Sequence, residues 1–404
     1  MKKIIAVVIS ISLILLVGCN NTNNDNSNLN DKILSKNYNQ IEDSAKGSTV
    51  NFYGWGGNEV FNKWFDNYVI PNMKNKYNIE VKRVGMDIDT IMNKLISENQ
   101  VQNTNGSVDV FWVNGENFKV AKDNGLLFGP FLDKIENYNN YVDKESKSIT
   151  TDFGTSVDNM ESPWGKASFT ILENSSKVPL NITDTKTLKD AIISNPGKFT
   201  YPAPPDFTGS AFVRNVIYDT VGYEKIKNLP EDKEKVREII KPAIDYLNEI
   251  KPYLWNEGKT YPSTIAQLDN MYSDNEIYFT MTYAPNEVEG KIESGEFDKS
   301  TKFINFEKGN ISNTHFLTIP KNASNKEGAI VLINYLTSID AQASKSNPKN
   351  WGDMTVLDME KLPTEDKSKF KNSVKIEKEV PEINANLVPI IEQIWIEEVA
   401  NSNE

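Results

Sequence analysis

The sequence predicts an α/β protein of two lobes, each built on a mixed, mainly parallel sheet flanked by helices. Short apolar runs typical of strands alternate with runs of helical period over residues 50–117, and a second such series covers residues 167–283. A late return strand is expected at 315–319. The predicted boundaries are residues 48–158 and 284–338 for lobe 1, and residues 159–283 and 339–404 for lobe 2.

The first series reads strand, helix, strand, helix, strand. Its elements are expected at residues 50–53, 60–71, 79–84, 87–101 and 108–113. The last strand is mostly apolar, as a central strand of a parallel sheet usually is. Pro71 should end the first helix. Because ligands of open parallel sheets lie beyond the carboxyl ends of the strands, the loops at 54–58 and 114–117 are candidates for a binding site.

The second series follows the segment Pro163-Trp164-Gly165 and holds more helix than the first. Its strands are expected at 167–172, 198–201 and 276–283, and its helices at 187–194, 208–221, 233–255 and 264–272. Beyond the return strand we expect a helix at 325–336 and a mostly helical tail, broken by prolines, at 339–404. The two series have separate strands and should therefore form two sheets.

Residues 201–212 are the most distinctive stretch of the second series. Three prolines stiffen the chain there, and a helix starts directly after them. The hydroxyl of Thr208 or Ser210 can cap the free N–H groups at the helix start. With Asp206 and an aromatic ring beside them, such a helix end suits a polar ligand. The same residues also fit an ordinary capped turn in which Asp206 bonds its own loop.

The first 19 residues are typical of a secretory signal peptide. Lys2 and Lys3 precede an apolar run that is too short for a comfortable transmembrane helix. Residues 16–19, Leu-Val-Gly-Cys, resemble the bacterial lipobox, so we predict lipidation of Cys19 and anchoring to the extracellular face of the cell membrane, as in Gram-positive bacteria. Cys19 is the only cysteine, which excludes an internal disulfide.

Residues 20–47 are polar and rich in asparagine, and they predict a disordered tether between the anchor and the lobes. A flexible chain of that length has a root-mean-square reach of roughly 30 Å. The globular part should therefore stand clear of the membrane surface.

Charge and residue usage exclude several classes of function. The formal net charge of −12 argues against nucleic acid as a partner, because phosphate binding needs clustered Lys and Arg. His315 is the only histidine, which excludes H-E-x-x-H zinc chemistry, and the sequence contains no G-x-x-x-x-G-K-[ST] motif for ATP. Residues 87–89 (Asp-Ile-Asp) begin like a calcium loop, but the positions that follow lack its ligands. We expect no metal site, no cofactor and no catalytic residue.

Two other functions stay open on the residues alone. Sequence spacing does not reveal the paired carboxylates of a surface glycoside hydrolase, because a cleft joins residues that are distant in the chain. A surface adhesin without a small ligand is the other alternative. Activity on a glycan panel would favour the hydrolase, and a cleft that stays empty and never closes would favour the adhesin.

Five stretches carry a resemblance to a known family, namely residues 53–57 (YGWGG), 109–118 (DVFWVNGENF), 163–165 (PWG), 199–212 (FTYPAPPDFTGSAF) and 283–286 (YAPN). The chain resembles the substrate-binding proteins of ABC importers, in the family 1 group of extracellular solute-binding proteins and a branch related to the thiamine-, polyamine- and iron-binding ones. The resemblance implies a type II periplasmic-binding-protein fold, whose lobes close on a small solute about two or three crossing strands. It also implies a monomer without enzymatic activity that delivers its solute to an ABC permease and its ATPase subunits.

The resemblance places these stretches at the cleft between the lobes. The residues expected to bind the ligand are Trp55, Gly56, Gly57, Asn114, Glu116, Asn117, Trp164, Tyr201, Asp206, Thr208, Gly209, Ser210, Tyr283 and Asn286. Trp164 stands outside any periodic pattern, which favours the cleft over the core, whereas the mid-strand position of Trp112 favours the core. Tyr201 fits either place.

The same residues favour a cationic or aromatic solute, with thiamine or a related compound first and a polyamine second. Aromatic rings can stack on a flat heterocycle or hold a cation, and Glu116 and Asp206 would supply negative charge. Of the three arginines only Arg214 lies near a candidate loop, so the sequence disfavours an anionic ligand.

Overall fold

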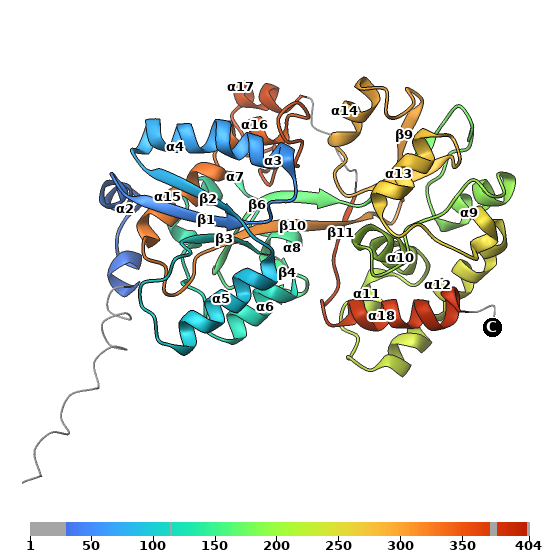
Figure 1. Ribbon diagram of the computed structural model, residues 1–404, viewed down its shortest axis with the longest axis horizontal. Coiled ribbons are helices and arrows are strands. Elements are labelled where there is room, and N and C mark those ends of the chain that lie inside the picture. The colour runs from blue at the N-terminus through green and yellow to red at the C-terminus, as the bar shows by residue number, and fades with distance from the viewer. Residues whose placement is uncertain (1–29, 114, 372–377, 402–404) are drawn as a thin grey trace, which may run out of the picture.

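The computed structural model describes residues 30–113, 115–371 and 378–401. The predicted signal peptide with Cys19, residues 20–29 of the predicted tether, and Asn114 lie outside the described residues. The described chain forms two bodies of helix and strand, lobe 1 and lobe 2, which lie side by side and are joined by extended segments (Figure 1). None of the helices in this part of the chain combines the length and apolar character needed to cross a bilayer.

Lobe 1 is built on a mixed sheet in the order β11-β10-β3-β1-β2, which β6 joins by pairing with β10. The strands are β1 (Thr49–Gly54), β2 (Glu80–Gly85), β3 (Val110–Val113), β6 (Glu161–Ser168), β10 (Asn310–Thr318) and β11 (Glu379–Pro381). β1 is parallel to β2 and β3, as the first series predicts, so their carboxyl ends share one edge. β10 runs antiparallel to β3 and β6 and parallel to β11.

Helices cover the sheet of lobe 1, with α3 and α4 above the strands and α5 and α6 below them in Figure 1. The helices are α2 (Tyr38–Ala45), α3 (Glu59–Trp64), α4 (Ile70–Tyr77), α5 (Ile88–Gln100), α6 (Glu116–Asp123), α7 (Glu136–Tyr141), α8 (Lys147–Thr150), α15 (Lys326–Leu336), α16 (Ile339–Ser346) and α17 (Thr364–Lys367). A small hairpin follows α8, formed by β4 (Thr151–Asp152) and β5 (Thr155–Ser156).

The helix after β1 does not end at Pro71, and that prediction is wrong. α3 continues through a π-helical turn at Phe65–Val69 into α4, with Pro71 in the first turn of α4. The N–H of Ile70 donates to the carbonyl of Phe65 across this wider turn. The widened turn accommodates a residue that has no N–H, so the helix runs on to Tyr77.

Lobe 2 is built on a three-stranded sheet in the order β8-β7-β9, with both pairs antiparallel. Its strands are β7 (Thr170–Asn174), β8 (Phe279–Thr282) and β9 (Thr301–Ile304). Its helices are α9 (Thr185–Ser194), α10 (Phe207–Thr220), α11 (Tyr223–Ile226), α12 (Lys233–Ile250), α13 (Ile265–Ser273), α14 (Glu287–Glu293) and α18 (Leu387–Trp395).

The sheet of lobe 2 is antiparallel rather than mainly parallel as predicted. The strand predicted at 198–201 is not formed. The carbonyl of Lys198 accepts from the N–H of Tyr278, and that of Phe199 accepts from the N–H of Trp255. The segment thus bonds to loops and stays outside the ladder of the sheet. The α/β class holds for both lobes.

Each lobe has its own core, and the cores redraw the predicted boundaries. Residues 287–306, predicted in lobe 1, pack side chains such as Val288 into the core of lobe 2. Residues 339–370, predicted in lobe 2, pack side chains such as Trp351 into the core of lobe 1. A sequence shows which runs are apolar, but not which of two cores buries them.

Three segments cross between the lobes. The chain leaves lobe 1 where β6 passes into β7, returns along β10, and crosses again at β11 (Figure 1). β10 takes part in both lobes, since Ile311 packs in the core of lobe 2 and Leu317 in that of lobe 1. These crossings lie where the family resemblance implies a hinge.

The second half of the predicted tether is folded. Asn37 caps α2 in a capping box with Gln40, in which each side chain accepts the other residue's backbone N–H. Ile41 and Ala45 are fully buried in the core of lobe 1. Composition alone did not reveal α2, a short amphipathic helix whose few apolar residues pack into the core.

Candidate functional site

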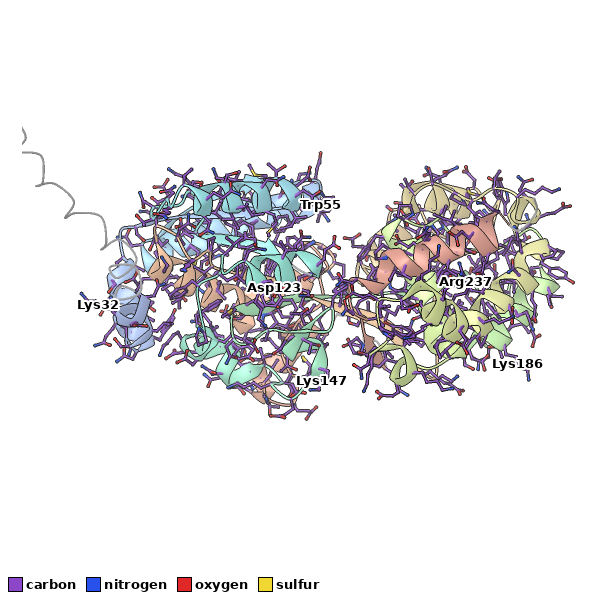
Figure 2. All side chains as sticks on the ribbon, turned by 90° about the horizontal axis from the view of Figure 1, so that it is seen from below. Lys32, Trp55, Asp123, Lys147, Lys186 and Arg237 are labelled. Atoms are coloured by element: carbon purple, nitrogen blue, oxygen red, sulfur yellow. The ribbon has the colours of Figure 1, made fainter. Side chains whose placement is uncertain are left out.

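The first wall of the candidate site is the loop that follows β1. Trp55 is 52% exposed there, and Figure 2 shows it on the side of lobe 1 that faces lobe 2. A Cβ on Gly56 would lie 3.0 Å from the backbone of Gly85, and one on Gly57 would overlap the ring of Trp55. The two glycines therefore let the loop lie close to β2 and leave room for the indole beside it.

The second wall is the start of α6, after β3. Glu116 is exposed in the first turn of this helix, where a carboxylate is favoured by the helix dipole, and Asn117 is half-buried. The N–H of Gly115 donates to Oδ2 of Asp152 at 2.6 Å. Burial raises the pKa of Asp152 to about 7, although this hydrogen bond opposes the shift.

The third wall is the N-terminus of α10 in lobe 2. Asp206 is the N-cap, and its Oδ1 accepts from the N–H groups of Thr208 and Gly209 at 3.0 Å each. The prediction that Thr208 or Ser210 caps the helix is therefore wrong. A Cβ on Gly209 would lie 1.9 Å from the carbonyl oxygen of Pro202, so this glycine serves the packing of the loop.

A buried polar network supports that third wall. Arg214 donates from Nε and Nη2 to the carboxylate of Glu382 at 3.0 and 2.9 Å, and both side chains are almost fully buried. Arg214 also donates to the hydroxyl of Ser210, which donates to Glu392. Ser210 is thus occupied within the protein rather than facing a ligand.

Tyr283 connects this network to the surface of the lobe. Its hydroxyl donates to Oε1 of Glu382 at 2.9 Å, and burial together with that carboxylate raises its pKa, so the phenol stays neutral. Its ring lies 4.7 Å from that of Phe207, which is 50% exposed. The two rings form an aromatic edge at the start of α10.

A cavity of about 360 Å³ opens beside this edge, lined by Thr208 and Tyr283 among others. Two carboxyl groups, of Asp269 and Glu287, line it together with one ammonium group, that of Lys291. Lys291 is paired with Asp269 at 2.6 Å. Burial raises the pKa of Glu287. The cavity offers an aromatic wall and the carboxyl group of Glu287, which forms no ion pair within the described residues, and this combination suits a cationic or hydrogen-bonding group.

The two lobes meet at a much smaller cavity on the hinge. Asp152 and Phe153 of lobe 1 line it with Glu382, and the volume left open is only about 10 Å³. Glu382, which accepts from Tyr283 in lobe 2, thus lies at the same small cavity as Asp152, which accepts from Gly115 at the start of α6. This contact between lobes is too tight to admit a solute.

Besides Gly209 and Ser210, which are buried at the start of α10, three of the predicted site residues are buried instead of lining a cleft. Trp164 is 0% exposed and lies among the rings of Phe61, Trp112 and Trp351. Tyr201 is fully buried, and its hydroxyl accepts from Nε1 of Trp395.

Asn286, the third, is fully buried with its amide 3.5 Å from the carbonyl of Ser346. A solute does not reach any of the three in this conformation, so the cleft prediction is wrong for them. The prediction relied on positions beside a proline or at the end of a strand. Such positions indicate irregular backbone, but a side chain on irregular backbone can be buried as well as exposed.

The residues expected to bind the ligand did not include Phe207 or Glu382, although the sequence places an aromatic ring beside Asp206. Phe207 lies inside the distinctive loop and outside the apolar stripe of α10, a signal that could have identified it as an exposed ring. Glu382 lies in the tail, 168 residues from its partner Arg214. No local pattern marks such a pair.

Comparison with known proteins establishes the family. The family model described as bacterial extracellular solute-binding protein matches residues 69–363. Protein YnjB of Escherichia coli (strain K12) is 34% identical over 364 residues, which are 88% of this chain and 92% of that protein. The chain belongs to the bacterial extracellular solute-binding proteins. The sequence resemblance to extracellular solute-binding proteins is confirmed.

Solved structures show the same fold at low sequence identity. An ABC transporter structure from Clostridium perfringens ATCC 13124 is 18% identical with a TM-score of 0.63, covering 86% of this chain and 98% of that one. The spermidine/putrescine substrate-binding protein PotD of Streptococcus pneumoniae is 13% identical with a TM-score of 0.62, covering 87% and 98%. The predicted type II, two-lobe fold is confirmed.

Proposed function

We propose that this solute-binding protein captures a small cationic or aromatic solute between its lobes and delivers it to the permease and ATPase of an ABC importer. The observation that carries the proposal is a set of three aromatic rings, two exposed and one half-buried, in the segments of both lobes that are predicted at the cleft. Trp55 belongs to lobe 1, and Phe207 and Tyr283 belong to lobe 2. The structural likeness to ABC transporter proteins supports the importer role.

The arginines argue against an anionic solute. Arg214 is held by Glu382, Arg83 donates to Asp66, and Arg237 is paired with Glu397 among others. Recognition of carboxylate or phosphate usually relies on a bidentate arginine. In this chain each guanidinium is already engaged by a carboxylate of the protein.

Thiamine or a related flat cation is our first choice of solute, and a polyamine is the second. An aromatic edge attracts a cation through the quadrupole of its rings. Glu116 and Glu287 can add charge from the two sides. PotD, with the same fold, is described as a spermidine/putrescine protein, which is compatible with the second choice.

Closure would follow from a ligand that touches both lobes, because a ligand shifts a conformational equilibrium only through its differential affinity for the two states. The crossing segments, with the small cavity that Asp152 and Glu382 both line, would then stay in place while the lobes move. Small-angle scattering should show a smaller radius of gyration with the solute than without it.

We also propose that lipidation of Cys19 anchors the protein outside the cell. The motif at residues 16–19 supports this. Replacing Cys19→Ser should release the protein from membranes or block its processing. A chain that stays in the membrane fraction with an unmodified N-terminus would contradict the anchor.

Calorimetric titration of the purified protein tests the solute class. The panel consists of thiamine, its pyrimidine, spermidine, a maltodextrin and ferric iron. We expect heat of binding from a cation, and a loss of affinity on Trp55→Ala of about 1–3 kcal/mol, as for removing a large buried apolar contact. Tyr253→Ala, another exposed ring in lobe 2, is the matched control and should bind as the wild type does.

Binding of a sugar or an anion without any cation response would reject the solute class and keep the solute-binding function. Equal affinity in Trp55→Ala and Tyr253→Ala would reject the aromatic site.

A further inference from the structure

The start of α6 carries Glu116 and Asn117, two residues of the candidate site, but the helix does not hold this end by itself. Its N-cap residue is Gly115, which has no side chain to cap the helix and whose backbone has a positive φ of 65°. The bond from the N–H of Lys119 to the carbonyl of Gly115, which closes the first turn, is long at 3.4 Å. The start of α6 therefore depends on contacts from outside the helix.

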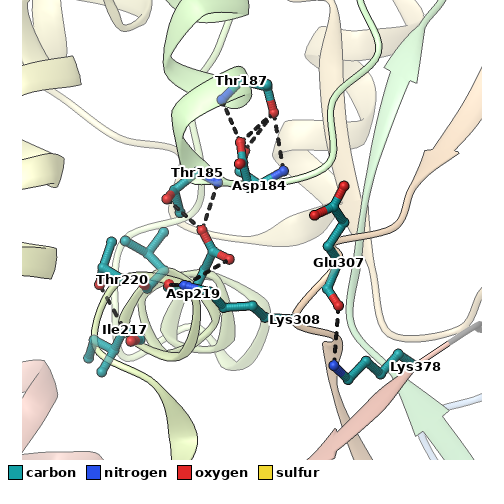
Figure 3. Close-up of polar contacts among 10 residues, drawn as sticks. Asp184, Thr185, Thr187, Ile217, Asp219, Thr220, Glu307, Lys308 and Lys378 are labelled. Carbon is teal, nitrogen blue, oxygen red and sulfur yellow. Dashed lines mark hydrogen bonds and ion pairs between the residues drawn. The ribbon is translucent and has the colours of Figure 1, made fainter.

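A helix of lobe 2 shows the more usual arrangement. Oδ1 of Asp184, the N-cap of α9, accepts from the N–H of Thr187 at 2.7 Å, and the hydroxyl of Thr187 accepts from the N–H of Asp184 (Figure 3). Side chains of the helix itself thus satisfy its free N–H groups, as in a capping box. Gly115 gives α6 no such cap, so the start of α6 must be held from elsewhere in the chain.

The hairpin of β4 and β5 holds α6 at both ends. At the start of the helix, the N–H of Gly115 donates to Oδ2 of Asp152 at 2.6 Å. In the last turn, Nζ of Lys122 donates to the carbonyl of Ser156 at 2.5 Å. Asp152 and Ser156 belong to opposite strands of the hairpin, so each strand binds one end of the helix.

The turn of this hairpin contains an unusual residue. Phe153 and Gly154 form the two-residue turn, and both have a positive φ, of 41° and 76°. Such turns favour Asn-Gly, whereas a bulky side chain at positive φ costs free energy. A Cβ on Gly115 would lie 3.4 Å from the ring of Phe153, so the strained residue places its ring against the start of α6. Strain of this kind is often found at functional sites.

The same turn contacts a segment that crosses between the lobes. A Cβ on Gly154 would lie 3.5 Å from Cα of Asn384, which follows Glu382 in that segment. The small cavity at the junction of the lobes is lined by Asp152, Phe153 and Glu382. The hairpin turn therefore lies between the start of α6 and the third crossing segment.

Asp152 itself is costly to the fold. Burial raises the pKa of its carboxyl group to about 7, which means that the folded protein disfavours the ionised form. Its one hydrogen bond within the described residues is the bond from Gly115. Residues that have shifted pKa values and reduce stability are typical of functional sites.

We propose that Asp152 is a positioning residue for the solute-binding role proposed above, on which this inference rests. Through its hydrogen bond to Gly115, and together with the ring of Phe153, it fixes the start of α6. The side chains of Glu116 and Asn117 are thereby held in the orientation that binds the solute.

Hydrogen exchange at residues 115–123 of the purified full chain, measured without any solute, tests the positioning. Asp152→Ala removes the acceptor of Gly115, and we expect exchange at the start of α6 to become faster. Asp152→Asn keeps an acceptor oxygen and should exchange as slowly as the wild type. Phe153→Asn removes the ring but suits the turn, so it should speed up exchange at residues 115–117 while the midpoint of thermal unfolding stays close to that of the wild type.

Calorimetry with thiamine and with spermidine tests the effect on binding. We expect Asp152→Ala to weaken the affinity about two- to tenfold, the range to which the net free energy of one hydrogen bond corresponds, and Asp152→Asn to bind as the wild type does. Asp184→Ala is the matched control, because it also removes a carboxylate that accepts at a helix start. Figure 2 shows Lys186 of α9 at the end of the molecule opposite to Trp55, so this variant should lose stability and keep its affinity.

Three results would overturn the proposal. They are unchanged exchange at residues 115–123 in Asp152→Ala, a loss of affinity in Asp152→Ala no larger than in Asp184→Ala, and an equal loss in Asp152→Asn. If the wild type binds neither probe, the solute class proposed above is wrong, and exchange at residues 115–123 alone decides whether Asp152 holds this helix. If Asp152→Ala does not fold, Phe153→Asn takes its place in both measurements.

Discussion

The two lobes bury charge in different ways on either side of the hinge. In lobe 2, Arg214 meets the carboxylate of Glu382 with two hydrogen bonds, and Tyr283 donates a third. In lobe 1, Asp152 is buried with one backbone N–H as its partner, and neither carboxyl oxygen of Glu161 has a hydrogen bond within the described chain. The pair in lobe 2 is compensated, whereas burial raises the pKa of the two carboxyl groups in lobe 1.

The buried ion pair should make its part of lobe 2 rigid, whereas the buried carboxyl groups should make the stability of lobe 1 depend on pH. The buried pair of Arg214 and Glu382 ties the crossing segment after β11 to α10 through its hydrogen bonds. Burial raises the pKa of Asp152 to about 7 and raises that of Glu161 well above its ordinary value, the neighbouring Asp152 adding to the second shift. Asp152 and Glu161 should therefore give lobe 1 a pH dependence of stability, to which Glu173 of lobe 2 adds, since burial raises its pKa to about 7 as well.

The largest effect should come from breaking the pair of lobe 2. Arg214→Met leaves the carboxylate of Glu382 buried without a cation, and we expect the free energy of unfolding to fall by about 3–5 kcal/mol. Urea unfolding at pH 7 measures it. Arg83→Met is the matched control, because its pair with Asp66 lies near the surface and should contribute at most about 1 kcal/mol.

The double variant Arg214→Met with Glu382→Leu sharpens this test. Removing both charges should recover most of the loss, because the cost comes from the charge left alone. If the double variant is as unstable as Arg214→Met, packing rather than charge holds this part of lobe 2.

The next effect concerns the tryptophans of lobe 1. Trp164→Ala should lower the free energy of unfolding by about 3–5 kcal/mol, because it empties a site at the centre of an aromatic core. Trp55→Ala should change it by no more than about 0.5 kcal/mol, because the ring is exposed. Chemical unfolding of both variants measures the difference, and equal losses would contradict the burial that separates them.

These two residues also show what a sequence can predict about the site. Trp55 follows a strand whose end the alternating pattern located, so its position at the sheet edge could be predicted. Trp164 lies in β6, whose polar and small residues hide a strand buried on both faces. Which core surrounds a strand depends on partners more than 100 residues away, such as β10. No local pattern contains that information.

The third effect is a pH dependence located in lobe 1. Because the folded state of Asp152 keeps its proton up to about pH 7 and the unfolded state releases it near pH 4, the folded state binds more protons between these values. Its contribution to stability is therefore full below about pH 4, falls as pH rises, and is lost above about pH 7.

Asp152→Asn should remove the part of this slope that Asp152 contributes and stabilise the protein above pH 7. Its amide oxygen can still accept the N–H of Gly115, so the fold should persist. The gain should be a few kcal/mol at most, since one pKa unit corresponds to about 1.4 kcal/mol. Unfolding midpoints from pH 4 to pH 8 measure it, and a variant with an unchanged slope would exclude Asp152 as the titrating group.

The smallest effect, at the start of α10, decides whether Asp206 has a role beyond its cap. Asp206→Ala should lower stability by about 1 kcal/mol, because the N–H groups of Thr208 and Gly209 lose their acceptor. Asp206→Asn should keep stability nearly unchanged, because asparagine caps as well as aspartate. Solute affinity measured in both variants then separates cap from charge. If only the cap matters, Asp206→Asn binds like the wild type; if the carboxylate attracts a cationic solute, Asp206→Asn keeps its stability and loses affinity, and the loss shrinks as salt screens the charge.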